Sequence, residues 1–118
     1  MLVVEDETDL CDLVKEVLEL HGYSVLPASS ADAAAHLAAR HDGPIDLVIT
    51  DVFTLGMGPR ELVADLKRAR PTMKVLYVSG HSDDKIARRA GAIEAALLRK
   101  PFTVGGLAKK VREVLDAR

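Results

Sequence analysis

The sequence of 118 residues has no tryptophan, and aromatic residues of any kind make up only 3% of it. With so few rings to stack on bases and a net charge of −2, this domain is not expected to bind nucleic acid. The single cysteine, Cys11, excludes an internal disulfide and is typical of a reducing compartment. No apolar run approaches the roughly 20 residues that a membrane-spanning helix needs. We therefore expect a cytoplasmic protein without a membrane segment.

What the sequence has is an aliphatic core. Hydrophobic residues make up 48% of the chain and charged residues 29%, which is ordinary for a globular domain. At this length we expect one domain covering residues 1–118. The apolar run Leu2–Val4 is short for a central strand, so we expect the first strand to be truncated at its N-terminus.

Hydrophobic periodicity alternates along the chain between the patterns of strands and of helices. Gly22 is predicted to stop the first helix, and Ser29 and Ser30 to cap the second. Five alternations predict an α/β fold, a doubly wound parallel sheet with helices on both faces and right-handed crossovers. The predicted strands are Leu2–Val4, Tyr23–Pro27, Ile45–Thr50, Lys74–Ser79 and Ala95–Arg99, and the predicted helices are Thr8–His21, Ala31–Arg40, Glu61–Arg70, Asp83–Ala90 and Val104–Ala117.

Acidic, hydroxyl and lysine side chains stand at the ends of the predicted strands. Ligands of open parallel sheets gather at the carboxyl ends of the strands, where the strand order reverses. Carboxylates brought together there repel one another unless a cation joins them. The pattern therefore predicts a metal-assisted site in which Asp51 does the chemistry. The residues at these strand ends are Glu5, Asp6, Asp51, Ser79 and Lys100.

Four segments resemble the receiver domain of two-component response regulators, and the resemblance covers essentially the whole chain. It implies a flavodoxin-like sheet of five parallel strands in the order 2-1-3-4-5. The stretch from Arg70 to Phe102 is especially similar to receivers attached to hybrid sensor kinases. The four segments are Val3-Val4-Glu5-Asp6-Glu7, Asp46-Leu47-Val48-Ile49-Thr50-Asp51, Val78-Ser79-Gly80 and Lys100-Pro101-Phe102.

The resemblance implies a role for each strand-end residue. Asp51 would be the nucleophile that takes a phosphoryl group from a kinase phosphohistidine. Lys100 would pair with Asp51 and then with a phosphoryl oxygen, while Ser79 would donate a hydrogen bond to another. Mg²⁺ would be the cofactor. Its expected ligands are Asp6 and Asp51 directly, Glu5 through water, and the backbone carbonyl of Phe53.

The implied function is a phosphorylation-operated switch that catalyses only its own phosphorylation and dephosphorylation and turns over no metabolite. Its expected partner is a sensor histidine kinase or a phosphotransfer domain, and the chain is a candidate for the receiver portion of a hybrid kinase. Phosphorylation would shift the population of a face formed by the fourth helix, the fifth strand and the last helix, which is also the expected homodimer surface.

Alternatives remain open at this point. Glu5 and Asp6 alone are also typical of solvated acids that open a helix. A non-phosphorylated interaction module on the same fold is the second functional class. A phosphatase of the haloacid dehalogenase class would carry an acid where this chain has Phe53, and a nucleotide-binding domain would carry a glycine-rich turn after the first strand.

Three positions depart from the receiver pattern. Leu55 stands where the family usually has proline, and Pro59 where it usually has glycine. Leu97 stands where the family often has an aromatic residue that takes part in the readout. None of these departures changes the acids, Ser79 or Lys100.

Overall fold

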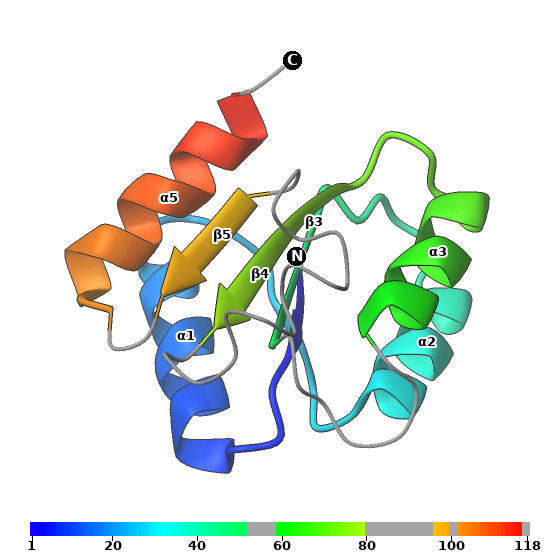
Figure 1. Cartoon of the computed structure of the whole chain (residues 1–118), viewed down its shortest axis with the longest axis horizontal. Helices are drawn as coiled ribbons and strands as arrows, with labels where there is room; N and C mark the ends of the chain where they lie inside the picture. Colours follow the sequence, from blue (N-terminus) through cyan, green and yellow to red (C-terminus); the bar gives the residue numbers. More distant parts are fainter. Residues whose placement is uncertain (52–58, 80–95, 100–101, 117–118) are drawn as a thin grey trace.

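Strands and helices alternate in the computed structural model of the chain (Figure 1). The structure describes residues 1–51, 59–79, 96–99 and 102–116, and describes only the backbone of Asp51, Pro59, Arg60, Ser79, Ala96, Leu97 and Arg99. The predicted loop after Asp51 and the predicted helix 83–90 lie outside these residues. The elements are β1 (Leu2–Val4), α1 (Thr8–Leu20), β2 (Leu26–Ala28), α2 (Ala31–Arg40), β3 (Leu47–Asp51), α3 (Pro59–Ala69), β4 (Lys74–Ser79), β5 (Ala96–Arg99) and α5 (Val104–Asp116).

The strands form one sheet in which every neighbouring pair runs parallel, in the order β2-β1-β3-β4-β5. The predicted α/β class and the flavodoxin-like order 2-1-3-4 are confirmed. Beyond these four strands, β5 pairs with β4 in the structure. Strand order reverses between β1 and β3, so the carboxyl ends of these two strands mark the switch point of the sheet.

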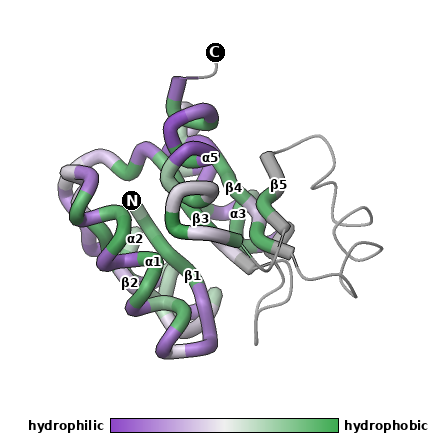
Figure 2. The backbone as a smooth tube through the Cα atoms, turned by 90° about the vertical axis from the view of Figure 1, so that its left-hand side faces the viewer, coloured by the Kyte–Doolittle hydropathy of each residue, from purple (hydrophilic) through white to green (hydrophobic). Residues whose placement is uncertain are grey.

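Helices cover both faces of the sheet, with α1 and α5 on one face and α2 and α3 on the other (Figure 1). Successive residues of a strand point to opposite faces, so Val3 joins the core under α1 and α5, whereas Leu2 and Val4 join the core under α2 and α3. Figure 2 shows the consequence along the chain, since β1 is hydrophobic throughout while α1 alternates hydrophobic and hydrophilic stretches. A sheet buried on both faces requires such continuously apolar strands.

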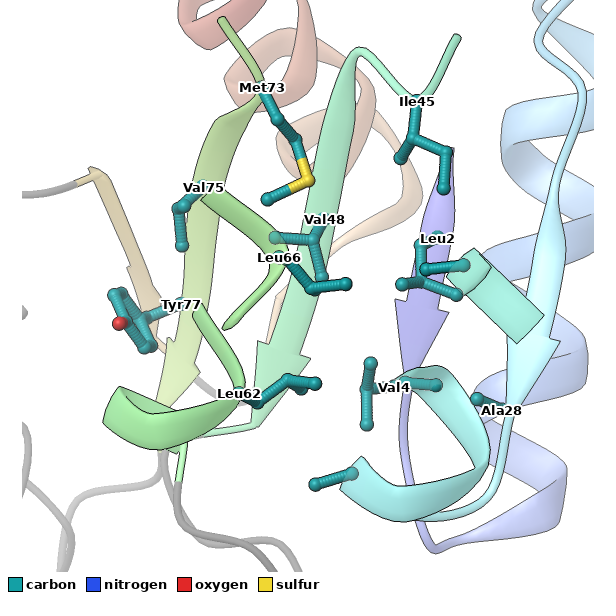
Figure 3. Packing of buried hydrophobic residues seen from close by; sticks show 13 residues of the cluster. Leu2, Val4, Ala28, Ile45, Val48, Leu62, Leu66, Met73, Val75 and Tyr77 are labelled. Atoms are coloured by element: carbon teal, nitrogen blue, oxygen red, sulfur yellow. The ribbon is translucent and has the colours of Figure 1, made fainter. Parts of the chain in front are cut away.

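The core under α2 and α3, which we call the α2–α3 cluster, is aliphatic apart from Tyr77 (Figure 3). Alanines on α2 let that helix approach the sheet closely, and Leu62 and Leu66 come from α3. The buried members of the cluster are Leu2, Val4, Ala28, Ala31, Ala34, Ala38, Ile45, Val48, Leu62, Leu66, Met73, Val75 and Tyr77.

Two strand positions differ from the sequence prediction. The predicted strand Tyr23–Pro27 is observed at Leu26–Ala28, and the predicted strand Ile45–Thr50 is observed at Leu47–Asp51. The strand β2 begins at Leu26, which pairs with Leu2 of β1, and β3 begins at Leu47, which pairs with Lys74 of β4. The available partner therefore decides where pairing begins, and Ile45 is buried in the core without being part of a strand.

The predicted helix signals act as expected. The Ser30 hydroxyl accepts a hydrogen bond from the Ala33 backbone N–H at 3.1 Å and so caps α2. Gly22 has a φ of 89° and ends the turn after α1 in the left-handed region that glycine adopts without strain. The helix α3 begins earlier than predicted, at Pro59, a residue suited to the first helical position. Among the described residues, no helix combines the length and the apolar character needed to cross a membrane.

Candidate functional site

The strand register brings the predicted site residues to one edge of the sheet. Val4 pairs with Thr50, so the next residues along β1 and β3 are Glu5 and Asp51. Asp51 in turn pairs with Val78, which precedes Ser79 on β4. Ser79 pairs with Arg99, the residue before Lys100. The carboxyl ends of these four strands thus lie along one edge of the sheet, which includes the switch point between β1 and β3, where parallel α/β sheets bind their ligands.

Glu5 is a buried acid, with only 6% of its surface exposed. Its backbone N–H donates to the Ala28 carbonyl at 3.0 Å, which extends the pairing of β1 with β2 by one residue. Its Oε1 accepts a hydrogen bond from the Glu7 backbone N–H at 3.1 Å. A buried carboxylate is costly unless hydrogen bonds or a cation compensate it, and the Glu7 hydrogen bond holds this side chain in place.

Asp6 follows Glu5 in the bend between β1 and α1, and it is exposed. The helix itself begins at Thr8, and its N-cap Glu7 makes no side-chain capping hydrogen bond. The Glu7 side chain therefore does not cap α1 in this structure. One carboxylate that is buried and one that faces solvent suit a cation that keeps part of its water shell.

Cys11, near the start of α1, is a buried thiol with two acids close to it. Burial raises the pKa of the Cys11 thiol, and the charges of Asp12 and Glu5 raise that pKa further. Cys11 is 6% exposed and packs in the core under α1 and α5, in keeping with its predicted packing role. A thiol whose pKa is raised stays protonated, so Cys11 is a poor nucleophile here.

A small hollow of about 250 Å³ opens beside the Glu5 end of this edge. Sequence reasoning missed Thr8 and Ser29 as lining residues, because a hydroxyl at a helix start or after an edge strand carries no distinctive sequence signal. The hollow is lined by Glu5, Thr8, Cys11, Asp12, Pro27, Ala28 and Ser29.

Two predicted site residues, Lys100 and Phe53, lie outside the described part of the chain. For Asp51 and Ser79 the structure gives the position on the backbone, at the last residue of β3 and of β4. Within the described side chains, no three acids, histidines or cysteines form a cluster able to hold a metal ion.

The order of the sheet and the acids that follow β1 and end β3 place this protein among the flavodoxin-like α/β proteins, which bind their ligands at the carboxyl ends of the strands. A model of the response regulator receiver domain matches residues 1–112, so the chain belongs to the receiver domain family of response regulators. Receiver domains are regulatory signalling modules of two-component systems.

Named relatives come from several kinds of signalling protein. The chain is 32% identical over 117 residues to the sensor kinase CckA of Brucella abortus, covering 98% of this chain and 12% of that protein. It is 34% identical over 122 residues to the nitrogen assimilation regulatory protein NtrX of Azorhizobium caulinodans, covering 98% of this chain and 26% of that protein. The chain thus spans a small part of the length of these relatives.

Solved structures agree with the fold. The receiver domain of NtrX from Brucella abortus superposes with a TM-score of 0.84 at 28% identity, covering 99% of this chain and 98% of that one. A receiver domain protein from Clostridium thermocellum gives a TM-score of 0.84 at 30% identity, covering 98% of this chain and 92% of that one.

Proposed function

We propose that this domain is a phosphoacceptor switch in which Asp51 receives a phosphoryl group from a histidine kinase or a phosphotransfer domain. The bond between phosphorus and the donor imidazole nitrogen breaks, and a bond forms between phosphorus and a carboxylate oxygen of Asp51. The observation that carries the proposal is the strand register: Thr50, the residue before Asp51, pairs with Val4, the residue before Glu5, and Asp51 pairs with Val78, the residue before Ser79. Membership of the receiver family supports the same chemistry.

Mg²⁺ is the proposed cofactor because the residues at this edge fit it. The acids supply only oxygen atoms, which Mg²⁺ prefers, and Glu5 is already buried and hydrogen-bonded. Asp6 and Asp51 would bind the ion directly, Glu5 through water, and the Phe53 carbonyl would complete the protein ligands. When bound, Mg²⁺ neutralises charge on the phosphoryl oxygens.

Lys100 and Ser79 are proposed to hold the phosphoryl group once it is on Asp51. Lys100 follows Arg99, which pairs with Ser79, so the two residues belong to adjacent strand ends. A lysine ammonium neutralises a phosphoryl oxygen, and a serine hydroxyl donates a hydrogen bond to another. Phosphoryl transfer depends mainly on such positioning and charge neutralisation, which explains why no other catalytic side chain is required.

The parent protein of this domain and its readout surface are also proposals. One relative, CckA, is a sensor kinase, which supports a place for this domain within a hybrid kinase. The cytoplasm is the proposed location. The face formed by the predicted fourth helix, β5 and α5 is the proposed surface for signal readout and for homodimer formation. The second candidate, an interaction module that is never phosphorylated, has the same fold but would not need Asp51.

The deciding experiment is phosphorylation of the purified domain by acetyl phosphate and Mg²⁺, followed by intact-mass spectrometry. We expect one phosphoryl group on the wild type and none on Asp51→Asn. Asp46→Asn is the matched control, because Asp46 is exposed at the start of the same strand region, away from the site edge. A wild type that accepts no phosphoryl group, from acetyl phosphate or from a kinase, would instead favour the interaction module.

A further inference from the structure

Two hydroxyl-bearing side chains in the core take no part in the proposed chemistry. Thr50 is 0% exposed and Tyr77 is 4% exposed. They pair with each other on β3 and β4, in the row of the sheet directly before the row of Asp51 and Val78. On the other side, Tyr77 pairs with Leu97 of β5. Tyr77 is therefore one of the β4 residues that pair both with the strand of Asp51 and with β5, and it is the one whose side chain lies in the α2–α3 cluster.

The ring of Tyr77 lies at one end of the α2–α3 cluster. Figure 3 shows its hydroxyl pointing away from the labelled aliphatic side chains, toward the side of β4 on which β5 runs. Val75, two residues earlier on β4, points to the same face and belongs to the same cluster. Within that cluster Tyr77 is the only aromatic ring and the member paired with β5.

A buried tyrosine in this position resists small adjustments. Protein cores are close-packed, so a shift of the end of β4 must be taken up by a discrete rearrangement of the groups packed there. A phenol ring is large, has few rotatable bonds, and carries a hydroxyl that needs a partner wherever the ring moves. A change in the packing of such a ring therefore requires its neighbours to rearrange with it.

We infer that Tyr77 is the positioning residue through which phosphorylation of Asp51 alters the β4–β5 edge of the sheet. The inference rests on the proposed function, and it names the residue through which the effect of phosphorylation would reach β5. Ser79, two residues after Tyr77 on the same strand, follows the phosphoryl group and moves the end of β4. The Tyr77 ring then changes its packing between the Thr50 row and β5.

The two tyrosines of the chain allow a direct test with the intact protein. The domain is labelled with 3-fluorotyrosine, and fluorine NMR is recorded before and after addition of Mg²⁺ and beryllofluoride, which mimics the phosphoryl group. Tyr23→Phe assigns the two signals. Tyr23 is the internal control, because it packs against the core on the other face and its hydroxyl interacts with Arg112 at 3.3 Å. We expect the Tyr77 signal to move and the Tyr23 signal to stay.

Two variants distinguish a role of Tyr77 in passing the effect of phosphorylation to β5 from a general role in core packing. In Tyr77→Leu we expect phosphoryl uptake by Asp51 within about twofold of the wild type, and loss of at least half of the beryllofluoride-induced amide shift at Leu98 and Phe102. Val75→Ala is the matched control, since it disturbs the same cluster on the same strand but lies farther from Asp51, and it should keep the shift.

Three outcomes overturn the inference. One is a Tyr77 fluorine signal that does not respond in a wild type whose amides do. Another is a full amide response in Tyr77→Leu, and the third is an equal loss in Val75→Ala. A wild type that responds to beryllofluoride nowhere, and accepts no phosphoryl group, overturns the proposed function itself.

Discussion

Arg70 connects two segments that are far apart in the sequence. Its guanidinium donates to the backbone carbonyls of Gly43 at 2.8 Å, His41 at 2.9 Å and Ala38 at 3.2 Å. These carbonyls belong to the end of α2 and the loop before β3, where a helix leaves acceptors without partners in the helix. One side chain thus satisfies the end of α2 and ties it to the segment after α3.

We predict that Arg70→Met lowers the free energy of unfolding by about 1–3 kcal/mol, because partly buried carbonyls lose charged hydrogen-bond donors. Urea unfolding followed by circular dichroism measures the change. Arg68→Met is the matched control, since Arg68 forms an exposed ion pair with Asp65, and this variant should stay within about 0.5 kcal/mol of the wild type. Equal effects of the two substitutions would contradict the role given to Arg70.

Cys11 makes a pH-dependent contribution to stability. Because burial raises its pKa above the ordinary value of 9.0, the folded state holds the proton more tightly than the unfolded state does. That contribution is complete below the pKa of the unfolded thiol and is lost as the pH rises through the pKa of the folded one. Stability should therefore fall more between about pH 7 and about pH 10 in the wild type than in Cys11→Ala, measured by urea unfolding at each pH. Equal slopes in the two proteins would contradict this assignment.

At the scale of an element, α1 carries one buried and one exposed leucine, so that truncating each to alanine compares the loss of core packing with the change in helix propensity alone. Leu18 is 0% exposed and packs under α1 against the sheet, whereas Leu20 is 79% exposed two residues later in the same helix. Leu18→Ala should cost about 2–5 kcal/mol of unfolding free energy because it leaves a cavity. Leu20→Ala should change it by less than about 0.5 kcal/mol. Denaturant midpoints of the two variants test the pair, and similar midpoints would mean that α1 packs differently from the structure.

At the scale of the whole molecule, the acids at the switch point couple folding to Mg²⁺. If only the folded chain binds the ion, Mg²⁺ at 100 times its dissociation constant should add about 2.7 kcal/mol to the unfolding free energy. Asp51→Asn should lose most of this gain. It should also be more stable than the wild type in EDTA, because one of the repelling carboxylates is gone. Thermal unfolding with and without Mg²⁺ measures both effects, and an equal gain in Asp51→Asn would place the ion elsewhere.

The order and type of the elements were predictable because their signals are local. Helical spacing of apolar residues, the cap at Ser30 and the stop at Gly22 all act within a few residues, and each acts in the structure as predicted. The strand-end position of Asp51 was predictable for the same reason, since it ends an apolar run. The catalytic roles of Asp51, Ser79 and Lys100 and the metal ligands stay predictions.

The sequence by itself determined the alternating strands and helices and which acids follow which strands, since periodicity and capping are properties of neighbouring residues. Only the tertiary structure decided where β2 and β3 begin, because β2 pairs from its first residue with β1 and β3 pairs from its first residue with β4. It also decided the burial of Glu5, the contacts of Arg70 across 27 to 32 residues, and the place of Tyr77 beside Thr50 and β5. These depend on contacts between distant segments, whose geometry no local pattern specifies.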